Sequence, residues 1–377
     1  MDFAFSPEQD ELRASARAVL AERLSPERLA EIGASESGWD EGLWRELAEL
    51  GWTGASIPEA NGGAGMGFLD EAVLFEELGR ALAPVPFFST VALALPALSA
   101  SEELLAGVVD GSVRATLAFA EPGGAASLAY AEAVKTEATE AGDRWTLSGE
   151  KTLVPDLGAA THVVVAARSG EGIGLWSVAR SGTRPEARVL TTVDSTRRLG
   201  RLRLDRNEAT LLVEPGAGEA VLAANRLRAL SALALEAVGI ADRAMTLAAD
   251  YAKGREQFGR PIGAYQAVSH PIVDTYVETE LARSLALWAA WCVAEDDEQT
   301  AIAVASAKAA AAEAAVAACE RSIQVHGGIG FTWEHVLHRL YKRAEWIEAW
   351  EGFGATHRAA VAHALFDAAP LVATTNR

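Results

Sequence analysis

The spacing of apolar residues changes twice along this chain of 377 residues, and this pattern limits the folds that are open to it. Up to about residue 110, apolar residues recur at intervals of three and four, which is typical of amphipathic helices. Between about 114 and 213 they alternate with polar residues and β-branched residues become frequent, which indicates strands. From about 218 onward the helical spacing returns in long alanine-rich segments. The sequence therefore predicts an α+β protein with a β domain between two helical parts.

We place the domain boundaries where the periodicity changes. An N-terminal α-helical domain is expected over residues 1–112, a middle β-sandwich or barrel over 113–216, and a C-terminal helical bundle over 217–377. Several long helices joined by short loops are typical of an antiparallel bundle, here of four or five helices.

Local signals predict the individual elements. Ser6 and Pro7 mark the start of the first helix, and Gln9 can complete a capping box. Further N-terminal helices are expected over 43–50, before Gly51, and over 69–82. Predicted strands are Ala115–Ala120, Ala131–Thr136, Trp145–Glu150, His162–Ala167, Leu175–Ala179, Arg188–Val193, Arg201–Leu204 and Thr210–Val213. Predicted bundle helices are Val221–Lys253, Gln266–Ala294, Thr300–Val325, one beginning near Thr332 and one ending near Phe366.

Charge and composition exclude several classes of protein. The chain has 33 Lys and Arg against 52 Asp and Glu, a formal net charge of −19, which argues against a nucleic-acid or anionic membrane partner. Cys292 and Cys319 are too few for a disulfide framework and read as buried small hydrophobes. The first 20 residues lack the basic and apolar regions of a signal peptide, and no run of about 18 uncharged apolar residues appears. We therefore expect no membrane span and a cytoplasmic location.

Three motifs in the C-terminal part point to a common chemistry. They are REQFGRPIG at 255–263 with a glutamine at 266, QVHGGIGF at 324–331, and WEG at 350–352; EPG at 121–123 opens the β region. Together, at this spacing, they resemble the acyl-CoA dehydrogenase family over essentially the whole chain. The resemblance implies an N-terminal helical domain, a middle β domain and a C-terminal four-helix bundle, with FAD as cofactor and an acyl-CoA thioester as substrate.

The first two motifs suit a nucleotide diphosphate. Arg255 lies where two predicted helices meet, and a guanidinium can pair with a pyrophosphate through a fork of donors. Gly327 and Gly328 expose backbone N–H groups between two helices, which also suits an anion. The alternatives are a surface arginine in a turn and a simple glycine helix cap. The resemblance implies that FAD bound mainly by a neighbouring subunit is contacted by Arg255, Phe258, Gln266, Gln324, Gly327 and Gly328.

Glu351 aligns with the catalytic base of the family. The resemblance implies that it removes the α-proton of the thioester while hydride leaves the β-carbon for the flavin, which gives a trans-2-enoyl-CoA. Such a base needs an apolar pocket, which Trp346, Trp350 and Phe353 could supply. The alternative is a solvent-exposed helix face, because glutamates at 345, 348 and 351 follow helical spacing. No metal site is expected, since His335 and His338 lack a third ligand at a suitable spacing.

The chain departs from the family where the flavin ring would be bound. The resemblance implies polar contacts at positions that are here Ala120, Ala126, Leu153-Val154-Pro155, Phe353 and Ala355. Pro155 offers neither a hydroxyl nor an N–H. The arginine that neighbours the base falls at Leu230, although Arg226 and Arg228 are close. Each buried polar group left unpaired costs about 1–3 kcal/mol, so weak flavin binding by this half is expected.

This pattern resembles bacterial acyl-CoA dehydrogenases that shorten steroid side chains as α2β2 heterotetramers, and the segment DSTRRLGR at 194–201 is similar to that subgroup. The first hypothesis is therefore a subunit that works with a homologous partner on a bulky, for example sterol-derived, acyl-CoA, with an electron-transfer flavoprotein as acceptor. The alternatives are an ordinary homotetramer, a non-catalytic subunit that completes the flavin site of a partner, and a flavin monooxygenase on the same scaffold.

Overall fold

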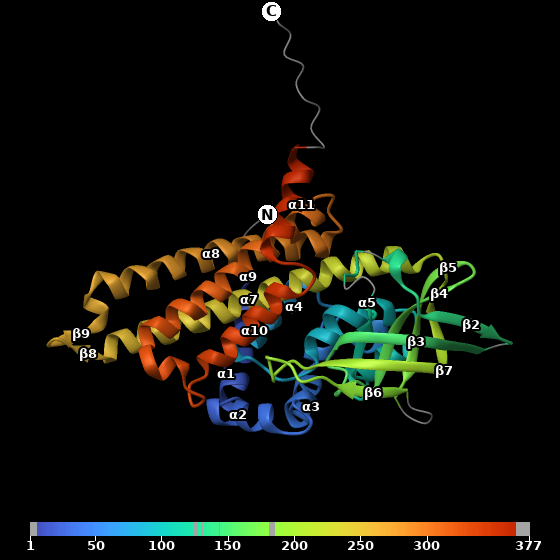
Figure 1. The fold of residues 1–377 in the computed structure, drawn as a ribbon, viewed down its shortest axis with the longest axis horizontal. Coiled ribbons are helices and arrows are strands. Elements are labelled where there is room, and N and C mark those ends of the chain that lie inside the picture. Colours follow the sequence, from blue (N-terminus) through green and yellow to red (C-terminus); the bar gives the residue numbers. More distant parts are fainter. Residues whose placement is uncertain (1–5, 124–126, 130, 143, 181–184, 367–377) are drawn as a thin grey trace, which may run out of the picture.

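N-terminal helices, a β-barrel and a helical bundle follow one another along the chain in the computed structural model (Figure 1). The structure describes residues 6–123, 127–129, 131–142, 144–180 and 185–366. The predicted α+β fold, with its order of helices, strands and helices, is confirmed. The barrel lies at one end of the elongated molecule and the tip of the bundle at the other.

The N-terminal part begins as the capping signals predict. The Ser6 hydroxyl accepts the N–H of Gln9, whose side chain accepts the N–H of Ser6. The part also contains a π-helix, η3, a rare form that often marks functional regions. Its elements are α1 (Pro7–Arg23), α2 (Pro26–Ala34), α3 (Glu41–Glu49), η1 (Trp52–Gly54), η2 (Glu59–Asn61), α4 (Phe68–Ala81), η3 (Phe88–Ala94), α5 (Leu95–Leu98) and α6 (Glu102–Val109).

Five of the seven strands of the sheet close a barrel, and β1 and β6 add to it. Strand β4 pairs with β5 along its whole length and with β1 and β2 in turn; β5 continues to β7, β7 to β3, and β3 back to β2, while β6 adds to β7. Alternating apolar residues such as Leu147, Val165 and Trp176 fill the interior. The strands are β1 (Ala115–Ala118), β2 (Glu137–Ala141), β3 (Arg144–Pro155), β4 (His162–Ser169), β5 (Gly172–Ala179), β6 (Glu186–Val189) and β7 (Leu199–Val213).

The strand predicted at Ala131–Thr136 is wrong. Ala131–Ala133 form a short 3-10 turn, η4. The N–H groups of Lys135 and Thr136 then donate to the carboxylate of Glu121, at 2.8 and 2.9 Å. These donors are therefore not available to a neighbouring strand, and the pairing that the alternation suggested begins only with β2.

Two other strand boundaries differ from the prediction. The expected strands Arg201–Leu204 and Thr210–Val213 are one strand, β7, because the polar residues between them form an irregularity and not a turn. Arg206 there takes a left-handed conformation, φ 51°, while the pairing with β3 continues on both sides. The strand expected at Arg188–Val193 lies earlier, as β6.

The bundle helices match the predicted ranges closely, except that α10 begins at Leu337 and not near Thr332. The long helices α7, α8 and α9 pack on one another, and α10 and α11 pack on α9. Cys292 and Cys319 are buried in this packing, as predicted. The elements are α7 (Gly218–Gly254), β8 (Glu256–Gln257), β9 (Arg260–Pro261), η5 (Ile262–Ala264), α8 (Gln266–Glu295), α9 (Thr300–His326), η6 (Gly327–Phe331), α10 (Leu337–Ala349) and α11 (Gly354–Phe366).

Helix α9 lies in the centre of the bundle and is unusually long and apolar. The segment Thr300–Phe331 is long and apolar enough to span a bilayer, but 67% of its most apolar window is buried inside the molecule. Its apolar face is covered by other helices of the bundle, which is the arrangement of a core helix.

A buried ionic cluster joins the barrel to the bundle. Arg197, from the loop before β7, donates twice to Glu236 of α7, at 2.8 and 2.9 Å. Arg343 of α10 pairs with Asp194 and donates to Thr196 at 2.7 Å. These side chains are almost fully buried, so breaking one pair would leave an uncompensated charge.

Asp156 adds a third carboxylate to the two guanidinium groups of this cluster. Burial raises the pKa of Asp156 to about 6, against the opposing influence of Arg197 and Arg343. One of its carboxylate oxygens has no hydrogen-bond partner in the described part of the chain. Asp156 therefore binds a proton more readily in the native cluster than in the unfolded chain.

Asp156→Asn tests this proton. The native pKa is raised above that of the unfolded chain, so the native state is favoured at low pH and loses stability as the pH rises through about 6. The variant should exceed the wild type at pH 8 by on the order of 3 kcal/mol and at pH 5 by only about half as much, measured by denaturant unfolding. Asp194→Asn, the control, should destabilise at both pH values. An equal effect of Asp156→Asn at pH 5 and pH 8 would contradict the assignment.

Candidate functional site

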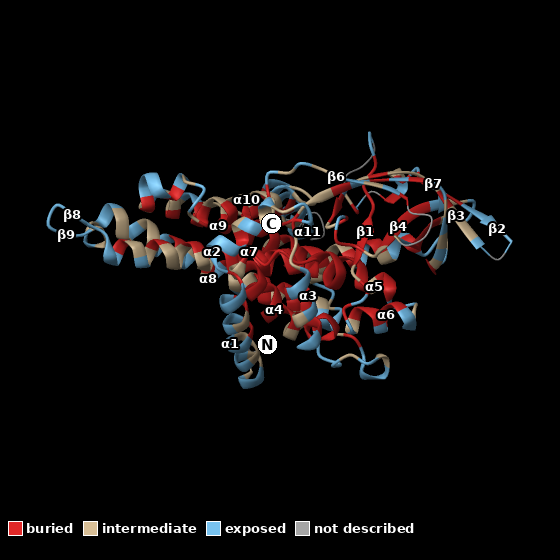
Figure 2. Ribbon diagram, turned by 90° about the horizontal axis from the view of Figure 1, so that it is seen from below, coloured by how far each residue is buried: buried red, intermediate tan, exposed pale blue. Residues whose placement is uncertain are grey.

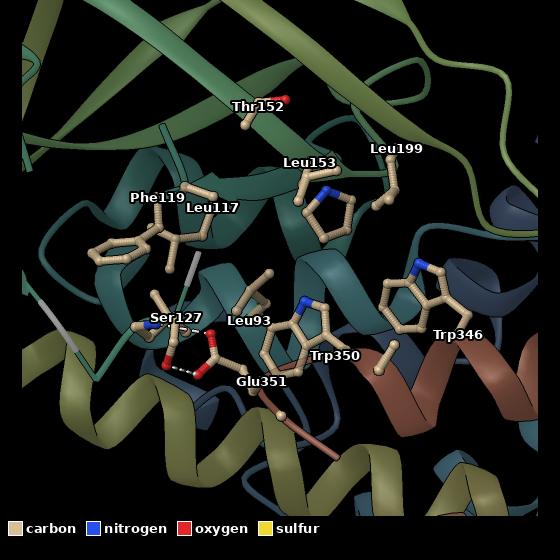
Figure 3. Close-up of a pocket in the computed structure, with 15 residues that line it drawn as sticks. Leu93, Leu117, Phe119, Ser127, Thr152, Leu153, Leu199, Trp346, Trp350 and Glu351 are labelled. Carbon is tan, nitrogen blue, oxygen red and sulfur yellow. Dashed lines mark hydrogen bonds between the residues drawn. The ribbon is translucent and has the colours of Figure 1, made fainter. Parts of the chain in front are cut away.

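A largely apolar cavity of about 540 Å³ lies where the barrel, the N-terminal helices and the end of α10 meet (Figure 3). Its volume is in the range of small-molecule sites. It is lined by Leu93, Leu117, Phe119, Ala120, Ser127, Leu128, Thr152, Leu153, Pro155, Leu199, Trp346, Ala349, Trp350, Glu351 and Gly352.

The barrel wall of the cavity is shaped by a bulge in β3. The pairing of β3 with β7 shifts register between Lys151 and Val154, and Leu153 takes a left-handed conformation, φ 53°. A bulge re-aims side chains, and here Leu153 and Pro155 both face the cavity. Beneath this wall the ammonium of Lys151 is anchored to Glu121 at 2.7 Å.

Several positions at which the sequence departs from the resemblance lie in this wall. Ala120, Leu153 and Pro155 line the cavity, while Phe353 and Ala355 are exposed and lie outside the lining. Ala126 falls outside the described residues. The wall offers few polar groups, and the hydroxyl of Ser127 is already committed to a neighbour. It does not fit the polar edge of a flavin ring.

The aromatic wall of the cavity comes from α10 and the turn after it. The rings of Trp346 and Trp350 are stacked at 6.4 Å, and Phe88 of η3 meets both edge-on. The guanidinium of Arg197 lies 4.7 Å from the Phe88 ring and 5.0 Å from the Trp346 ring. The ionic cluster therefore packs directly against this aromatic wall.

Glu351 lies in the cavity and not on a solvent-exposed helix face. Helix α10 ends at Ala349, and Glu351 follows in a left-handed conformation, φ 58°, with its side chain only 3% exposed. The alternative of a continuous face with Glu345 and Glu348 is wrong for this residue, because the helix stops before the third position. A non-glycine residue in this conformation is held by its surroundings and often marks a functional site.

Three donors hold the Glu351 carboxylate. The Ser127 hydroxyl donates to Oε2 at 2.6 Å and the Leu128 N–H donates to Oε1 at 2.8 Å, and both contacts are drawn in Figure 3. The Nε of Arg226 donates to Oε2 at 2.7 Å. The carboxylate is thus anchored at both oxygens, by the barrel side and by α7.

Arg226 provides the cation that the resemblance places at Leu230. Leu230 is buried. Arg226 lies one helical turn earlier on the same face of α7, and its guanidinium reaches the carboxylate of Glu351. Arg228 does not take this role, because it pairs with Glu71 and donates to Ser56.

The other predicted site residues lie at the tip of the bundle, and all of them are exposed. Figure 2 shows the β8–β9 hairpin at this tip in the colour of exposed residues. Arg255, Phe258 and Gln266 lie between the end of α7 and the start of α8, and Gln324, Gly327 and Gly328 lie at the end of α9. The two groups are joined by Tyr251 of α7, whose ring stacks on His326 of α9 at 4.4 Å.

The hairpin at this tip presents Phe258 to solvent. Strands β8 and β9 are joined by Phe258 and Gly259, both with positive φ, which is the pattern of a tight type I′ turn. Phe258 is 92% exposed in a conformation that bulky residues rarely adopt. An exposed aromatic residue in such a conformation indicates a surface that contacts a ligand or another chain.

The residues at the tip fit a nucleotide diphosphate. Arg255 offers a guanidinium, and Gln266 and Gln324 offer side-chain amides. Gly327, at φ 63° and ψ −139°, has a backbone that favours glycine, and a Cβ at Gly328 would meet nothing within 4 Å. This open backbone allows an anionic ligand to approach closely.

Helix α7 sets the distance between the tip and the cavity. Arg226 and Arg255 lie on this helix and at its end, and a rise of 1.5 Å per residue puts them about 43 Å apart. One dinucleotide cannot reach both places on the same chain. The structure places the six residues at the same end of the bundle, far from Glu351.

Sequence reasoning missed several groups of the cavity. Ser127 and Leu128 carry no motif, and only the three-dimensional arrangement brings them to Glu351. Arg226 could have been found, since residues four apart share a helix face. His335 and His338 have no further ligands around them: the described residues contain no group of three or more His, Cys, Asp or Glu that could hold a metal ion.

A double-mutant cycle measures the ion pair. Arg226→Ala leaves a nearly buried carboxylate without its cation and should lower the free energy of unfolding by about 1–3 kcal/mol, below the value for a fully buried pair because Arg226 is partly exposed. Arg226→Ala combined with Glu351→Gln should recover part of this loss, which gives a coupling of about 0.5–3 kcal/mol. Arg144→Ala with Glu208→Gln, an exposed pair, is the control and should show little coupling. Additive effects at Arg226 and Glu351 would contradict the geometry.

Comparison with known proteins now gives the family. Residues 6–104 match the family model "Acyl-CoA dehydrogenase, N-terminal domain", and residues 219–366 match "Acyl-CoA dehydrogenase, C-terminal domain". Acyl-CoA dehydrogenase IpdE2 of Mycobacterium tuberculosis is 35% identical, with 89% of this chain and 91% of the relative covered.

Solved structures agree with this. A steroid ACAD variant named Tcur3481-Tcur3483 is 37% identical with a TM-score of 0.84, covering 96% of this chain and 98% of that one. The ChsE4-ChsE5 complex from Mycobacterium tuberculosis is 28% identical with a TM-score of 0.87, covering 98% and 100%. With the matching fold and the motifs at their family spacing, these similarities show that the chain belongs to the acyl-CoA dehydrogenase family, whose members are FAD-dependent enzymes.

Proposed function

We propose that this chain is one subunit of a heteromeric acyl-CoA dehydrogenase and that it completes the flavin site of a homologous partner. The reaction is the α,β-dehydrogenation of an acyl-CoA to the trans-2-enoyl-CoA. FAD, when bound, supplies the hydride acceptor. In this arrangement Arg255, Phe258 and Gln266, with Gln324, Gly327 and Gly328, hold the diphosphate side of the cofactor.

The observation that carries this proposal is the contrast between the two ends of α7. The tip offers a cation, two amides and open glycine backbone to a nucleotide on another chain. The cavity at the other end is walled by Leu153, Pro155 and Ala120, where the resemblance implies polar contacts. This chain offers the residues for the diphosphate of FAD but few polar groups for its isoalloxazine ring. It would gain a complete site by pairing with a chain whose barrel binds the ring.

The geometry of Glu351 bears on which chain carries the base. A base must present a free carboxylate oxygen to the α-carbon proton of the substrate. Here Ser127, Leu128 and Arg226 occupy both oxygens. Oε2 takes two of these donors and Oε1 takes one, so only one lone-pair site on Oε1 stays open and the carboxylate has little freedom to move toward a substrate, which favours a base on the partner chain.

A bulky, for example steroid-derived, acyl group is the substrate class that we propose. The similarity to a protein named as a steroid ACAD supports it, as does the similarity to the ChsE4-ChsE5 complex for a heteromeric assembly. An electron-transfer flavoprotein as acceptor and a cytoplasmic location remain predictions.

An ordinary homotetramer is the second candidate, favoured by the burial of Glu351 in an apolar cavity of this chain. In that case backbone groups would replace the lost side-chain contacts, and Glu351 would be the base. Glu351→Gln separates the two candidates in the active assembly. Under the first candidate turnover stays close to that of the wild type; under the second it falls by several orders of magnitude.

The proposal predicts what the purified chain contains. Expressed alone, it should carry little FAD, with weak absorbance near 450 nm, because its ring half lacks the polar contacts. Co-expressed with the homologous subunit that co-purifies with it from its native cells, it should form an assembly with one FAD per two chains. Flavin absorbance and light scattering measure both quantities. A yellow homotetramer of this chain alone that oxidises an acyl-CoA would contradict the proposal.

Arg255→Ala tests the diphosphate contact within that assembly. Loss of a charge-assisted fork costs about 1.5–3 kcal/mol, so the dissociation constant for FAD should rise about 10- to 100-fold. Lys253→Ala is the matched control, because it removes a nearby exposed cation that only approaches Asp250, and FAD binding should stay unchanged. Equal FAD affinity in wild type and Arg255→Ala would place the cofactor elsewhere.

A further inference from the structure

The turn that carries Glu351 has a buried ammonium behind it. Lys308 of α9 is fully buried, and its Nζ donates to the carbonyl of Glu348 at 3.3 Å and to the carbonyl of Gly352 at 3.4 Å. The first carbonyl belongs to the last turn of α10 and the second follows Glu351. A single ammonium therefore joins the two sides of the turn.

This turn is otherwise difficult to maintain. Glu351 and Gly352 both have positive φ, 58° and 102°, and a left-handed glutamate is unfavourable without support from its surroundings. The last carbonyls of a helix also lack partners within the helix, and a cation at that end is favourable. Lys308 meets both needs, since it satisfies carbonyls at the end of α10 and draws the chain back toward α9.

The surroundings of Lys308 make it specific to this turn. It stands in an alanine-rich stretch of α9, where Ala311 and Ala312, one helical turn further on, share its face of the helix and are buried. The charged and titratable groups that act on it or on which it acts are Glu348, Glu351, Arg226 of α7 and His357 of α11. The carboxylate of Glu351 thus lies between two cations, with Arg226 on the cavity side and Lys308 behind the backbone.

We infer that Lys308 is the positioning residue that turns Glu351 into the cavity: it joins the carbonyls on both sides of the left-handed turn and so keeps the carboxylate beside Arg226. Without this ammonium, the two sides of the turn would no longer be joined, and Glu351 would be free to leave the left-handed conformation and its place beside Arg226. The inference deepens the proposed function, because it names the residue that controls the geometry of Glu351, whichever subunit carries the base.

The test uses the full chain alone, without flavin or partner. The double-mutant cycle of Arg226→Ala and Glu351→Gln is measured again in a Lys308→Met background. Methionine fills the space without a charge or a donor, so the coupling should fall to less than half of its wild-type value. Hydrogen exchange at the amides of Trp350 and Gly352, which are bonded to the last turn of α10, should become at least tenfold faster.

Lys151→Met is the matched control. Lys151 is an equally buried lysine, on β3, and its ammonium bonds Glu121 and the carbonyl of Phe119 and does not reach Glu351. This variant should destabilise the chain and leave both the Arg226–Glu351 coupling and the exchange at Trp350 unchanged. A merely structural role of Lys308 would give the same pattern as the control.

Full coupling and unchanged exchange in Lys308→Met would overturn the inference. If this variant does not fold, Lys308→Gln, which keeps a donor without the charge, is judged by the same criteria, with values expected between wild type and methionine. The result is independent of the proposed function. The Arg226–Glu351 coupling is measured on the chain alone, without cofactor, whereas the need for a partner is tested by the flavin content of the purified protein.

Discussion

The length of helix α7 is the constraint on which the account of the site depends. This helix of 37 residues begins beside the barrel and ends at the exposed tip of the bundle. It carries Arg226 to Glu351 at one end and Arg255 to the diphosphate-type surface at the other, about 43 Å away. The two half-sites therefore serve two different cofactors or two different chains. Under the proposed function, oligomerisation is therefore a geometric requirement for a complete flavin site.

The cavity depends on a second set of interactions that lock three parts of the fold together. Arg197 bonds Glu236 and packs against the aromatic wall, Arg343 ties α10 to the loop before β7, and Arg226 ties α7 to the turn after α10. Each of these contacts is charged and poorly exposed, so it is costly to leave unmade. Their combined effect is a rigid apolar cavity whose one carboxylate is held in place, which differs from an open, polar flavin cleft.

The sequence predicted long elements and motif positions well because those depend on local pattern. Helices α7, α8 and α9 have many turns of consistent spacing, and the two glycine motifs fix where α7 and α9 end. The prediction failed where a distant side chain decides the backbone: Glu121 captures the N–H groups before β2, so the strand predicted at Ala131–Thr136 does not form. The partners of the Glu351 carboxylate, Ser127 and Leu128, lie more than 220 residues away in the sequence. No local pattern contains such information.

The most direct measurement of the central claim is the structure of the assembled complex with its cofactor, by electron cryomicroscopy or crystallography. The account predicts that Arg255 and Gln324 contact the diphosphate of an FAD whose ring lies in the barrel of the partner subunit. It also predicts that no flavin ring lies against Leu153 and Pro155 of this chain. A flavin ring seated in this chain's own cavity, with Glu351 released from Arg226 and facing the substrate, would contradict it.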